Sequence, residues 1–318
     1  MANPTILTAG IDTSKSKLDI AIHGRSDGFT VANDAAGWKR LTGQLAKAGV
    51  HRVGIEATGG YERGVSRQLQ AAGILVVTLQ PLQVKAFARL HLKRAKSDRI
   101  DAVLIAACTH VLDAAGKMAP DPRFDALSDH LTFIEQVEED ITRIKTRLEH
   151  IHDKRLRGIA SNDLKKQEKR RDAEIQRLIV ALRVHDDLST RFDLVLSIPG
   201  IGERTALALV VRMPELGQVS REQAAALAGL APFVRESGQQ QGQNHIGGGR
   251  ERLRRSLYLA ALPAASHWNT ELMALYARLK QRGKCHRSAL VACARKLLVF
   301  ANTVVQRGTP WEKRSINA

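Results

Sequence analysis

Two short apolar segments, each ending in a carboxylate, most constrain how this chain can fold. Residues 9–12 read Ala-Gly-Ile-Asp and residues 53–56 read Val-Gly-Ile-Glu, so each predicts a buried strand that ends at an acid. An ionised acid beside apolar strand residues loses hydration, and it therefore needs a charged partner or a bound cation. Taken singly, Asp12 and Glu56 are explained more simply as solvated acids at strand ends.

The first 90 residues predict an α/β layer with a mixed sheet. Three β-forming segments come first, and two apolar segments then alternate with helical ones; the expected strands are residues 6–12, 17–23, 29–32, 53–57 and 74–79. This order favours antiparallel pairing among the first strands and parallel pairing, through right-handed crossovers, among the later ones. Ligand sites in such sheets lie off the carboxyl ends of parallel strands, where Asp12 and Glu56 are expected.

A third acidic feature is the segment 96–101, Lys-Ser-Asp-Arg-Ile-Asp, ahead of a helix predicted over residues 102–112. Asp98 and Asp101 are three residues apart, which places both on one helix face, and a divalent cation would offset their like charges. Capping of a helix N-terminus by Ser97 or Asp98 explains this segment on its own more simply. Together with the two strand-end acids, however, four carboxylates can converge on one edge of a sheet, a combination far more specific than its parts.

The chain carries a formal net charge of +17, from 49 Lys and Arg against 32 Asp and Glu in 318 residues. Such an excess favours a polyanionic partner, because contacts to phosphates release counterions. No apolar run approaches the length of a membrane-spanning helix, and residues 1–9 lack a signal-peptide pattern, so no membrane partner is expected. Three scattered cysteines without metal-binding spacing are typical of a reducing cytoplasm.

A long charged region follows a linker at residues 120–125. Residues 126–191 contain a single glycine and a series of apolar residues at three- and four-residue spacing: Leu127, Leu131, Ile134, Val137, Ile141, Ile144, Leu148 and Ile151. This seam predicts a helical hairpin or coiled coil, with a break near residues 158–162. The second arm carries a basic run at residues 165–171, which contacts nucleic acid or, more commonly, forms a solvated helix face.

The last third of the chain combines a glycine turn, a polar loop and a basic helix. Residues 198–202, Ile-Pro-Gly-Ile-Gly, precede a predicted helix, and Gly200 and Gly202 would let backbone N–H groups approach a phosphate as in helix-hairpin-helix units. An ordinary tight turn explains the same residues equally well. The helix predicted over residues 250–262 carries arginines placed to bind phosphates, namely Arg250, Arg252, Arg254 and Arg255.

Read in order, these motifs resemble the DEDD transposases of the insertion sequence 110 family, which are related to the pilin-inversion recombinase Piv. The resemblance covers nearly the whole chain. It is carried by seven segments: Gly-Ile-Asp at 10–12, Gly-Ile-Glu-Ala-Thr-Gly at 54–59, Lys-Ser-Asp-Arg-Ile-Asp-Ala at 96–102, Ile-Pro-Gly-Ile-Gly at 198–202, Ala-Gly-Leu-Ala-Pro at 228–232, Glu-Ser-Gly at 236–238 and Leu-Arg-Arg-Ser-Leu at 253–257.

The resemblance implies three regions. A RuvC-like domain with the ribonuclease H fold is expected over residues 1–118, a helical coiled-coil region over 119–192, and an α-helical transposase domain with a helix-hairpin-helix-like element over 193–318. In the first, Asp12, Glu56, Asp98 and Asp101 are expected to bind Mg²⁺, with Mn²⁺ as the alternative. In the transposase domain, Ser237 is expected to be the nucleophile. Without the resemblance it would be an ordinary loop serine, because no histidine or lysine lies at a spacing from which it could activate the hydroxyl.

The resemblance also implies an activity and partners. Members of this family cleave and rejoin DNA through a phosphoserine intermediate, guided by a structured bridge RNA that pairs with double-stranded donor and target DNA. They act as homo-oligomers, dimers or tetramers, in which the serine of one subunit completes the carboxylate site of another. Such a protein would be located in the bacterial cytoplasm, associated with the nucleoid when bound to DNA.

One departure from the family pattern concerns residues 247–249. The family usually has a basic residue in the segment before the Leu-Arg-Arg helix, whereas this chain has three glycines, so a phosphate contact there is lost or is taken over by Arg250. Two other functions are consistent with the residues. One is a RuvC-type junction resolvase or nuclease, in which water attacks and no covalent intermediate forms. The other is a non-catalytic scaffold that binds nucleic acid.

Overall fold

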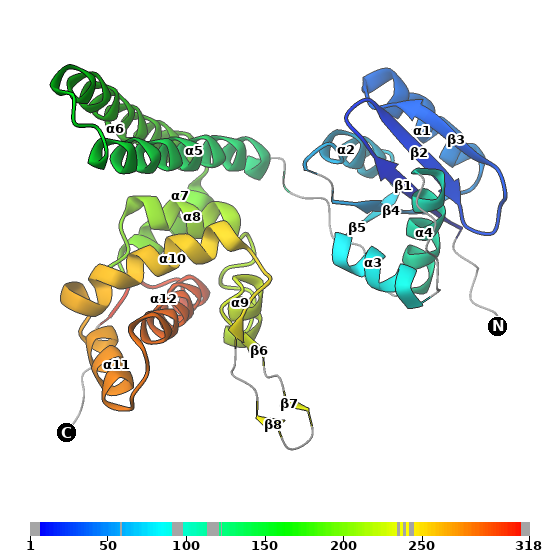
Figure 1. Ribbon diagram of the computed structural model, residues 1–318. Helices are drawn as coiled ribbons and strands as arrows, with labels where there is room; N and C mark the ends of the chain where they lie inside the picture. Colours follow the sequence, from blue (N-terminus) through cyan, green and yellow to red (C-terminus); the bar gives the residue numbers. More distant parts are fainter. Residues whose placement is uncertain are drawn as a thin grey trace. The chain divides into compact units, whose positions relative to one another are not determined.

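The computed structural model describes residues 7–57, 59–90, 98–112, 121, 123–233, 236–237, 240–241 and 245–312, with the backbone alone at 98–100, 233, 236–237 and 240–241. Lys96 and Ser97, which precede the predicted helix, lie outside the described residues. The chain divides into two units, Met1–Asp121 and Pro122–Ala318. Each unit is drawn in Figure 1 and is described by itself.

The first unit is built on a five-stranded mixed sheet of order β3-β2-β1-β4-β5 (Figure 1). Its strands are β1 (Thr8–Thr13), β2 (Lys17–Ile22), β3 (Gly28–Ala32), β4 (Arg52–Glu56) and β5 (Leu75–Leu79). The pairs β1–β2 and β2–β3 are antiparallel, and the pairs β1–β4 and β4–β5 are parallel. The predicted mixed α/β sheet is therefore confirmed. Its helices are α1 (Ala35–Lys47), α2 (Arg63–Ala71), α3 (Pro81–Leu90) and α4 (Asp98–Val111).

The sheet separates two apolar cores, because successive side chains of a strand point to opposite faces. On one face, strand residues such as Ile11 and Ile55 pack with Leu41 of α1 and Leu69 of α2. On the other face, the core joins β5 to the third and fourth helices; its residues are Val77, Leu79, Val84, Leu104, Ile105 and Cys108. The three-layer arrangement leaves the ends of the central strands β1 and β4 available for a site.

The second unit is mostly helical, as predicted (Figure 1). Its helices are α5 (Arg123–Glu149), α6 (Lys154–Arg183), α7 (Asp186–Leu196), α8 (Glu203–Arg212), α9 (Arg221–Leu227), α10 (Glu251–Pro263), the π-helix η1 (Ala264–Trp268), α11 (Thr270–Gln281) and α12 (His286–Arg307). Between α9 and α10 lie four two-residue strands, β6 (Pro232–Phe233), β7 (Glu236–Ser237), β8 (Gln240–Gln241) and β9 (His245–Ile246). Helix α8 is central, since all of its residues from 205 to 211 are buried.

The apolar seam of the long charged region forms the contact between α5 and α6. Leu127, Leu131 and Ile134 of α5 share one core with Leu178 and Leu182 of α6. The seam is buried only in its first part, because Val137 and Ile141 are the last fully buried seam residues of α5. The far part of the hairpin is consequently a solvated two-helix arm.

The break predicted near residues 158–162 is wrong, because α6 runs through this segment without interruption. The turn lies earlier, at residues 150–153, where the Asp153 side chain accepts a hydrogen bond of 2.8 Å from the Leu156 backbone N–H and begins α6. Gly158 lies within the helix, and nothing surrounds the position a Cβ would take. A single helical glycine costs only about 0.5–1 kcal/mol, which is too little to end a helix of 30 residues.

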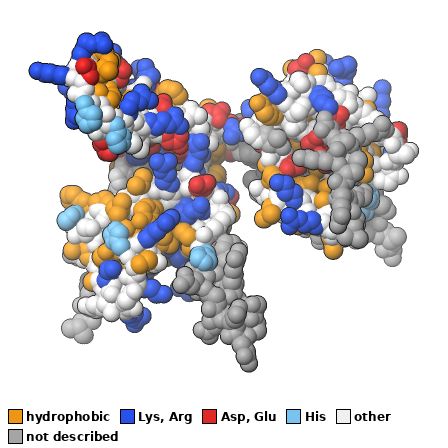
Figure 2. All heavy atoms as spheres, viewed as in Figure 1, with side chains coloured by type: hydrophobic (Ala, Val, Ile, Leu, Met, Phe, Trp, Pro, Cys, Tyr) orange, Lys and Arg blue, Asp and Glu red, His pale blue; other side chains and the backbone are white. Residues whose placement is uncertain are grey.

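Lys and Arg side chains gather on the arm formed by α5 and α6, as Figure 2 shows. In the basic run of α6, Lys165, Lys169 and Arg170 are exposed, and Lys166 forms only a long surface ion pair of 3.8 Å with Asp163. These residues are exposed to solvent in this structure, and their contact with nucleic acid stays a prediction. Among the described residues, α12 is the one helix whose length and composition would allow it to span a membrane, but 56% of its apolar window is buried, as in the core helix of a folded domain.

Candidate functional site

Asp12 and Glu56 are brought together at the carboxyl ends of β1 and β4. The two strands are parallel, with Gly10 opposite Gly54 and Ile11 opposite Ile55. Continued by one residue, this register sets Asp12 opposite Glu56, and both residues are partly exposed. Because alternate residues of a strand share a face, the two carboxylates lie on the face that carries the two glycines.

Helix α4 lies directly on this face, and the two glycines allow its close approach. A Cβ on Gly10 would overlap the backbone of α4 at Ala102 and Ala106, and a Cβ on Gly54 would overlap the side chain of Thr109. The glycine two positions before each acid, a pattern visible in the sequence, therefore makes room for the helix. Its N-terminal end lies over β1 beside Gly10, which brings the start of α4 toward the carboxylates.

The opposite end of α4 is fixed at the amino ends of the same strands. Arg52, the first residue of β4, donates a hydrogen bond of 2.6 Å from Nη2 to the Leu112 carbonyl, just after α4. His110 of α4 stacks on His23, which follows β2, with ring centroids 4.2 Å apart. The helix thus runs antiparallel to β1 and β4, and its N-terminus, with Asp98 and Asp101, lies at the edge that holds Asp12 and Glu56.

Acidification is expected to weaken this anchoring of α4. Burial lowers the pKa of His23, and the charge of the neighbouring His110 lowers it further. The unfolded chain then binds a proton more readily than the folded chain, so the stability is fully present above pH 6.5 and is lost as pH falls through the depressed folded pKa. Thermal unfolding of the full-length protein from about pH 8 to about pH 5 should show this loss, and His23→Asn should flatten it. An unchanged pH dependence in His23→Asn would refute the assignment.

The donors at this edge fit a hard divalent cation. Carboxylate oxygens are the protein ligands that Mg²⁺ and Mn²⁺ prefer, and the positive end of the α4 dipole also favours anionic side chains here. Within the side chains that the structure describes, no group of three or more His, Cys, Asp or Glu stands at metal-binding spacing. The side chain of Asp98 lies outside that set. The placement of Asp12, Glu56 and the start of α4 at one edge therefore rests on the backbone: on the register of β1 and β4 and on the direction of α4.

Ser237 lies in the second unit, on a hairpin between α9 and α10. It is the second residue of β7, where its backbone pairs with Gln240 of β8. At the base of this hairpin a second antiparallel pair, β6 with β9, places Pro232 opposite Ile246. Figure 1 labels β6, β7 and β8 of this segment beyond α9. Ser237 is thus carried by a local β structure in an otherwise helical unit.

The two glycines predicted to contact phosphate have different surroundings. Gly200 adopts a left-handed backbone with φ of 97°, and a Cβ there would overlap the Ala264 side chain, so packing explains this glycine. Gly202 is the exposed N-cap of α8 and has open space around it. The carboxylate of the next residue, Glu203, accepts a hydrogen bond of 2.8 Å from Gln176. A phosphate contact at Gly202 stays a prediction.

The arginines predicted to bind phosphate make contacts within the protein. Arg250 forms a bidentate pair with Glu215, with N–O distances of 2.6 and 2.8 Å, so it is not available in this structure to replace a basic residue at 247–249. Arg254 donates to the Gly248 carbonyl at 2.6 Å. Arg255 is exposed and lies 3.6 Å from Glu139, a weak surface pair. Phosphate binding by these arginines stays a prediction.

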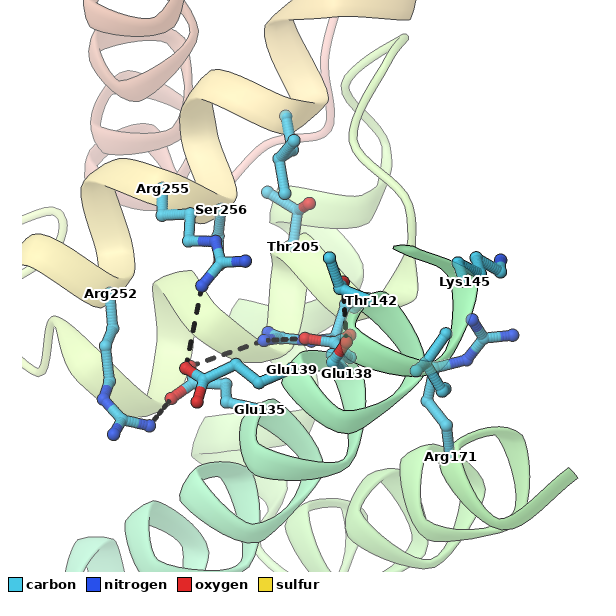
Figure 3. A pocket seen from close by; sticks show the side chains of 13 residues that line it. Glu135, Glu138, Glu139, Thr142, Lys145, Arg171, Thr205, Arg252, Arg255 and Ser256 are labelled. Carbon is cyan, nitrogen blue, oxygen red and sulfur yellow. Dashed lines mark hydrogen bonds and ion pairs between the residues drawn. The ribbon is translucent and has the colours of Figure 1, made fainter. Parts of the chain in front are cut away.

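Sequence reasoning missed a buried carboxylate, Glu135, that joins α5 to two other helices (Figure 3). It accepts hydrogen bonds from Arg212 of α8 at 2.6 and 3.0 Å and from Arg252 of α10 at 2.6 Å. Arg204 of α8 lies 3.4 Å away and forms its own bidentate pair with Glu138. In a helical seam, the sequence around position 135 does not distinguish Glu135 from the neighbouring acids Glu138 and Glu139, which are only partly buried.

These charges line a hollow of about 310 Å³ between α5, α6, α8 and α10 (Figure 3). Burial alone raises the pKa of Glu135, but hydrogen bonds from Arg212 and Arg252, with the charges of Arg212 and Arg204, outweigh it and hold the pKa below its ordinary value. Glu135 is therefore ionised at neutral pH and holds the arm against the rest of the second unit. Arg252, which the sequence assigned to phosphate, belongs to this network.

Among solved structures, part of the chain is similar to RuvC of Thermus thermophilus, free and in complex with a Holliday junction substrate. The complex aligns at a TM-score of 0.27 with 20% identity and covers 32% of this chain and 92% of that chain. The free protein aligns at 0.26 with the same identity.

Three known proteins are similar in sequence. The pilin gene-inverting proteins of Moraxella bovis and Moraxella lacunata are each 27% identical over 329 aligned residues, covering 96% of this chain and 97% of theirs. An uncharacterised 43.6 kDa protein of insertion element IS110 from Streptomyces coelicolor is 32% identical over 120 residues, 37% of this chain and 29% of that protein.

Two family models also match, in the same order along the chain. The DEDD transposase model of IS110 elements matches residues 9–154, which include the four carboxylates. The model described as "Transposase IS116/IS110/IS902 family" matches residues 192–277, which include Ser237. The chain therefore belongs to the IS110 family of transposases and is a DNA transposase/recombinase.

Proposed function

We propose that this protein is a metal-dependent, RNA-guided transposase that cuts and rejoins DNA through a phosphoserine at Ser237. The observation that carries the proposal is the convergence of Asp12, Glu56 and the N-terminus of α4 on one sheet edge. Its first unit would have the RuvC-like ribonuclease H fold. The pair α5–α6 would act as a coiled coil, and the turn between α7 and α8 as a helix-hairpin-helix-like element.

The four carboxylates would hold the metal. Asp12 and Glu56 are fixed by the β1–β4 register, and Asp98 and Asp101 come from the first turn of α4. Bound Mg²⁺ or Mn²⁺ would offset negative charge on the phosphoryl oxygens and lower the pKa of a hydroxyl. The four carboxylates would have to remain ionised and to position the phosphate. The positive end of the α4 dipole favours the ionised form of carboxylates that lie near it.

Ser237 would attack the scissile phosphate. A bond forms between its Oγ and phosphorus, and one P–O ester bond to the DNA breaks. The serine hydroxyl loses one proton and the leaving DNA oxygen gains one, so the number of bound protons does not change. The phosphoserine keeps an ester of similar energy, so the reverse attack by a DNA hydroxyl rejoins the strands without ATP. No histidine or lysine lies at a sequence spacing from which it could activate the Ser237 hydroxyl. Its activation would therefore come from the metal held by the four carboxylates.

The partners would be double-stranded donor and target DNA and a guide RNA. The net charge of +17 supports polyanionic partners. Guidance by a bridge RNA, assembly as a homo-oligomer and completion of one subunit's carboxylate site by another subunit's Ser237 follow the family resemblance. The location would be the bacterial cytoplasm and nucleoid. Family membership argues against the non-catalytic scaffold, and hydrolysis of the RuvC type remains the second candidate for the chemistry.

Trapping a covalent intermediate would test the proposal. The full-length protein is incubated with Mg²⁺, a plasmid carrying the ends of its element, and RNA transcribed from the DNA that flanks its reading frame; denaturing gels and mass spectrometry then follow. We expect a DNA adduct on Ser237, lost in Ser237→Ala with DNA binding retained, and present in the control Ser266→Ala. Cleavage by Ser237→Ala, or strand breaks without an adduct, would instead establish attack by water.

A further inference from the structure

A second hollow, of about 460 Å³, lies in the second unit between α10, α12 and β9. Three arginines and a tyrosine line it: Arg254, Arg255, Arg287 and Tyr258, with Ile246 and Glu251 at its border. We propose that this hollow binds the phosphodiester backbone of the DNA strand on which Ser237 acts, and that Arg287 is a positioning residue for that strand. The inference rests on the proposed role of Ser237.

The convergence of the arginines follows from the packing of α10 on α12. Leu253 and Leu257 of α10 share a core with Leu290 and Ala294 of α12, so the adjoining turns of the two helices face a common space. In α10, Arg254 and Arg255 lie one turn before Tyr258, and in α12 Arg287 occupies the first turn. Three guanidinium groups against one carboxylate give the hollow a net charge of +2, which suits a phosphate.

Arg287 has no evident role in holding the fold. It is exposed, and within the described part of the chain no acidic side chain lies within 4.0 Å of it, unlike Arg250 and Arg252. It also stands in the first turn of α12, where the helix dipole disfavours a cation. An exposed arginine that has no acidic partner among the described side chains, and that borders a cationic hollow, is suited to a bound anion.

The hollow also adjoins the root of the hairpin that carries Ser237. Ile246, at its border, pairs with Pro232 to close that root. Arg254 donates to the Gly248 carbonyl, and Gly249 lies so close to Gly229 that a Cβ would overlap its backbone. A strand bound here is therefore held at the base of the segment bearing the nucleophile, which favours DNA over RNA as the ligand.

The hollow further accounts for the glycines at 247–249. Gly248 and Gly249 have positive φ, of 63° and 61°, and form the tight connection into α10. The positive charge missing from this segment is supplied across the hollow by Arg287 of α12. The ring of Tyr258 and the side chain of Ile246 add an apolar wall against which one base can stack.

The test compares two exposed arginines at opposite ends of α12, Arg287→Gln and the control Arg307→Gln. Each is made in full-length Ser237→Ala protein, and binding of a duplex from the element's end, with the guide RNA present, is measured by fluorescence anisotropy at several salt concentrations. We expect Arg287→Gln to weaken DNA binding roughly tenfold and to lower the salt slope by about 1, with Tm unchanged. Arg287→Lys should recover the slope.

The outcomes separate this inference from the proposed function. Unchanged DNA affinity and slope in Arg287→Gln, or an equal loss in Arg307→Gln, would overturn it while the Ser237 adduct stands. Weaker binding of the guide RNA alone, with DNA binding intact, would also overturn it. Absence of the adduct in otherwise wild-type protein, together with the expected loss in Arg287→Gln, would reject the serine chemistry but keep the hollow as a DNA site.

Discussion

Replacing Asp12 with asparagine is expected to slow DNA cleavage by roughly 10²- to 10⁴-fold, because the cation of the proposed carboxylate site would contribute several kcal/mol to stabilising the transition state. The amide has almost the shape of the carboxylate but lacks its charge. The folded structure should be retained, since asparagine keeps the size and the hydrogen-bonding shape of aspartate. The measurement is single-turnover cleavage of a duplex from the element's end with Mg²⁺ and guide RNA, together with thermal unfolding.

Asp27→Asn is the matched control. Asp27 is an exposed acid between β2 and β3, at the edge of the sheet opposite to Asp12, since the end of β2 pairs with the start of β1. It should cleave at the normal rate. Glu56→Gln should match Asp12→Asn, and the double variant should lose little more, because in the proposed site the two acids would hold one cation. A cleavage rate within a few-fold of normal in Asp12→Asn would reject the carboxylate site.

Replacing Glu135 with glutamine should destabilise the second unit by about 3 kcal/mol, and so lower its Tm by about 6–12 °C. The change leaves Arg212, whose side chain is 14% exposed, without its main counter-charge. It also removes the negative charge that Arg252 and Arg204 contact. Breaking this network at its centre is costly, since the side chains of Arg212 and Arg204 remain largely buried. Thermal unfolding of the full-length protein would measure the change.

Glu139→Gln, one turn later on α5, provides the comparison. Its partner Arg255 lies 3.6 Å away and both side chains are over one-third exposed, so the expected loss is about 0–1 kcal/mol. Because the pKa of Glu135 is lowered from 4.5, its stabilisation is fully present above that pH and is lost as pH falls through the depressed folded value. Equal stabilities for Glu135→Gln and Glu139→Gln would show that the buried network contributes nothing.

Much of the first unit could be predicted from local patterns. Strand alternation, the order of strands and helices, and the acids at the ends of residues 9–12 and 53–56 are properties of neighbouring residues. Parallel pairing of those strands then brings Asp12 and Glu56 to one edge, because their ends are in register. The same local rules failed at residues 158–162, where exposed polar residues and a glycine imitate a turn but remain helical.

The sequence by itself determined most of the strands and helices, singled out the four carboxylates and Ser237, and indicated the family to which the motifs belong. The tertiary structure decided which other side chains and helices these and the remaining functional residues contact. Gly10 and Gly54 admit α4, Glu135 becomes a buried anion, Arg250 is tied to Glu215, and Arg287 joins two arginines of α10. Periodicity and capping act over a few neighbouring residues, whereas these contacts join residues far apart in the chain and exist only once helices and strands have packed.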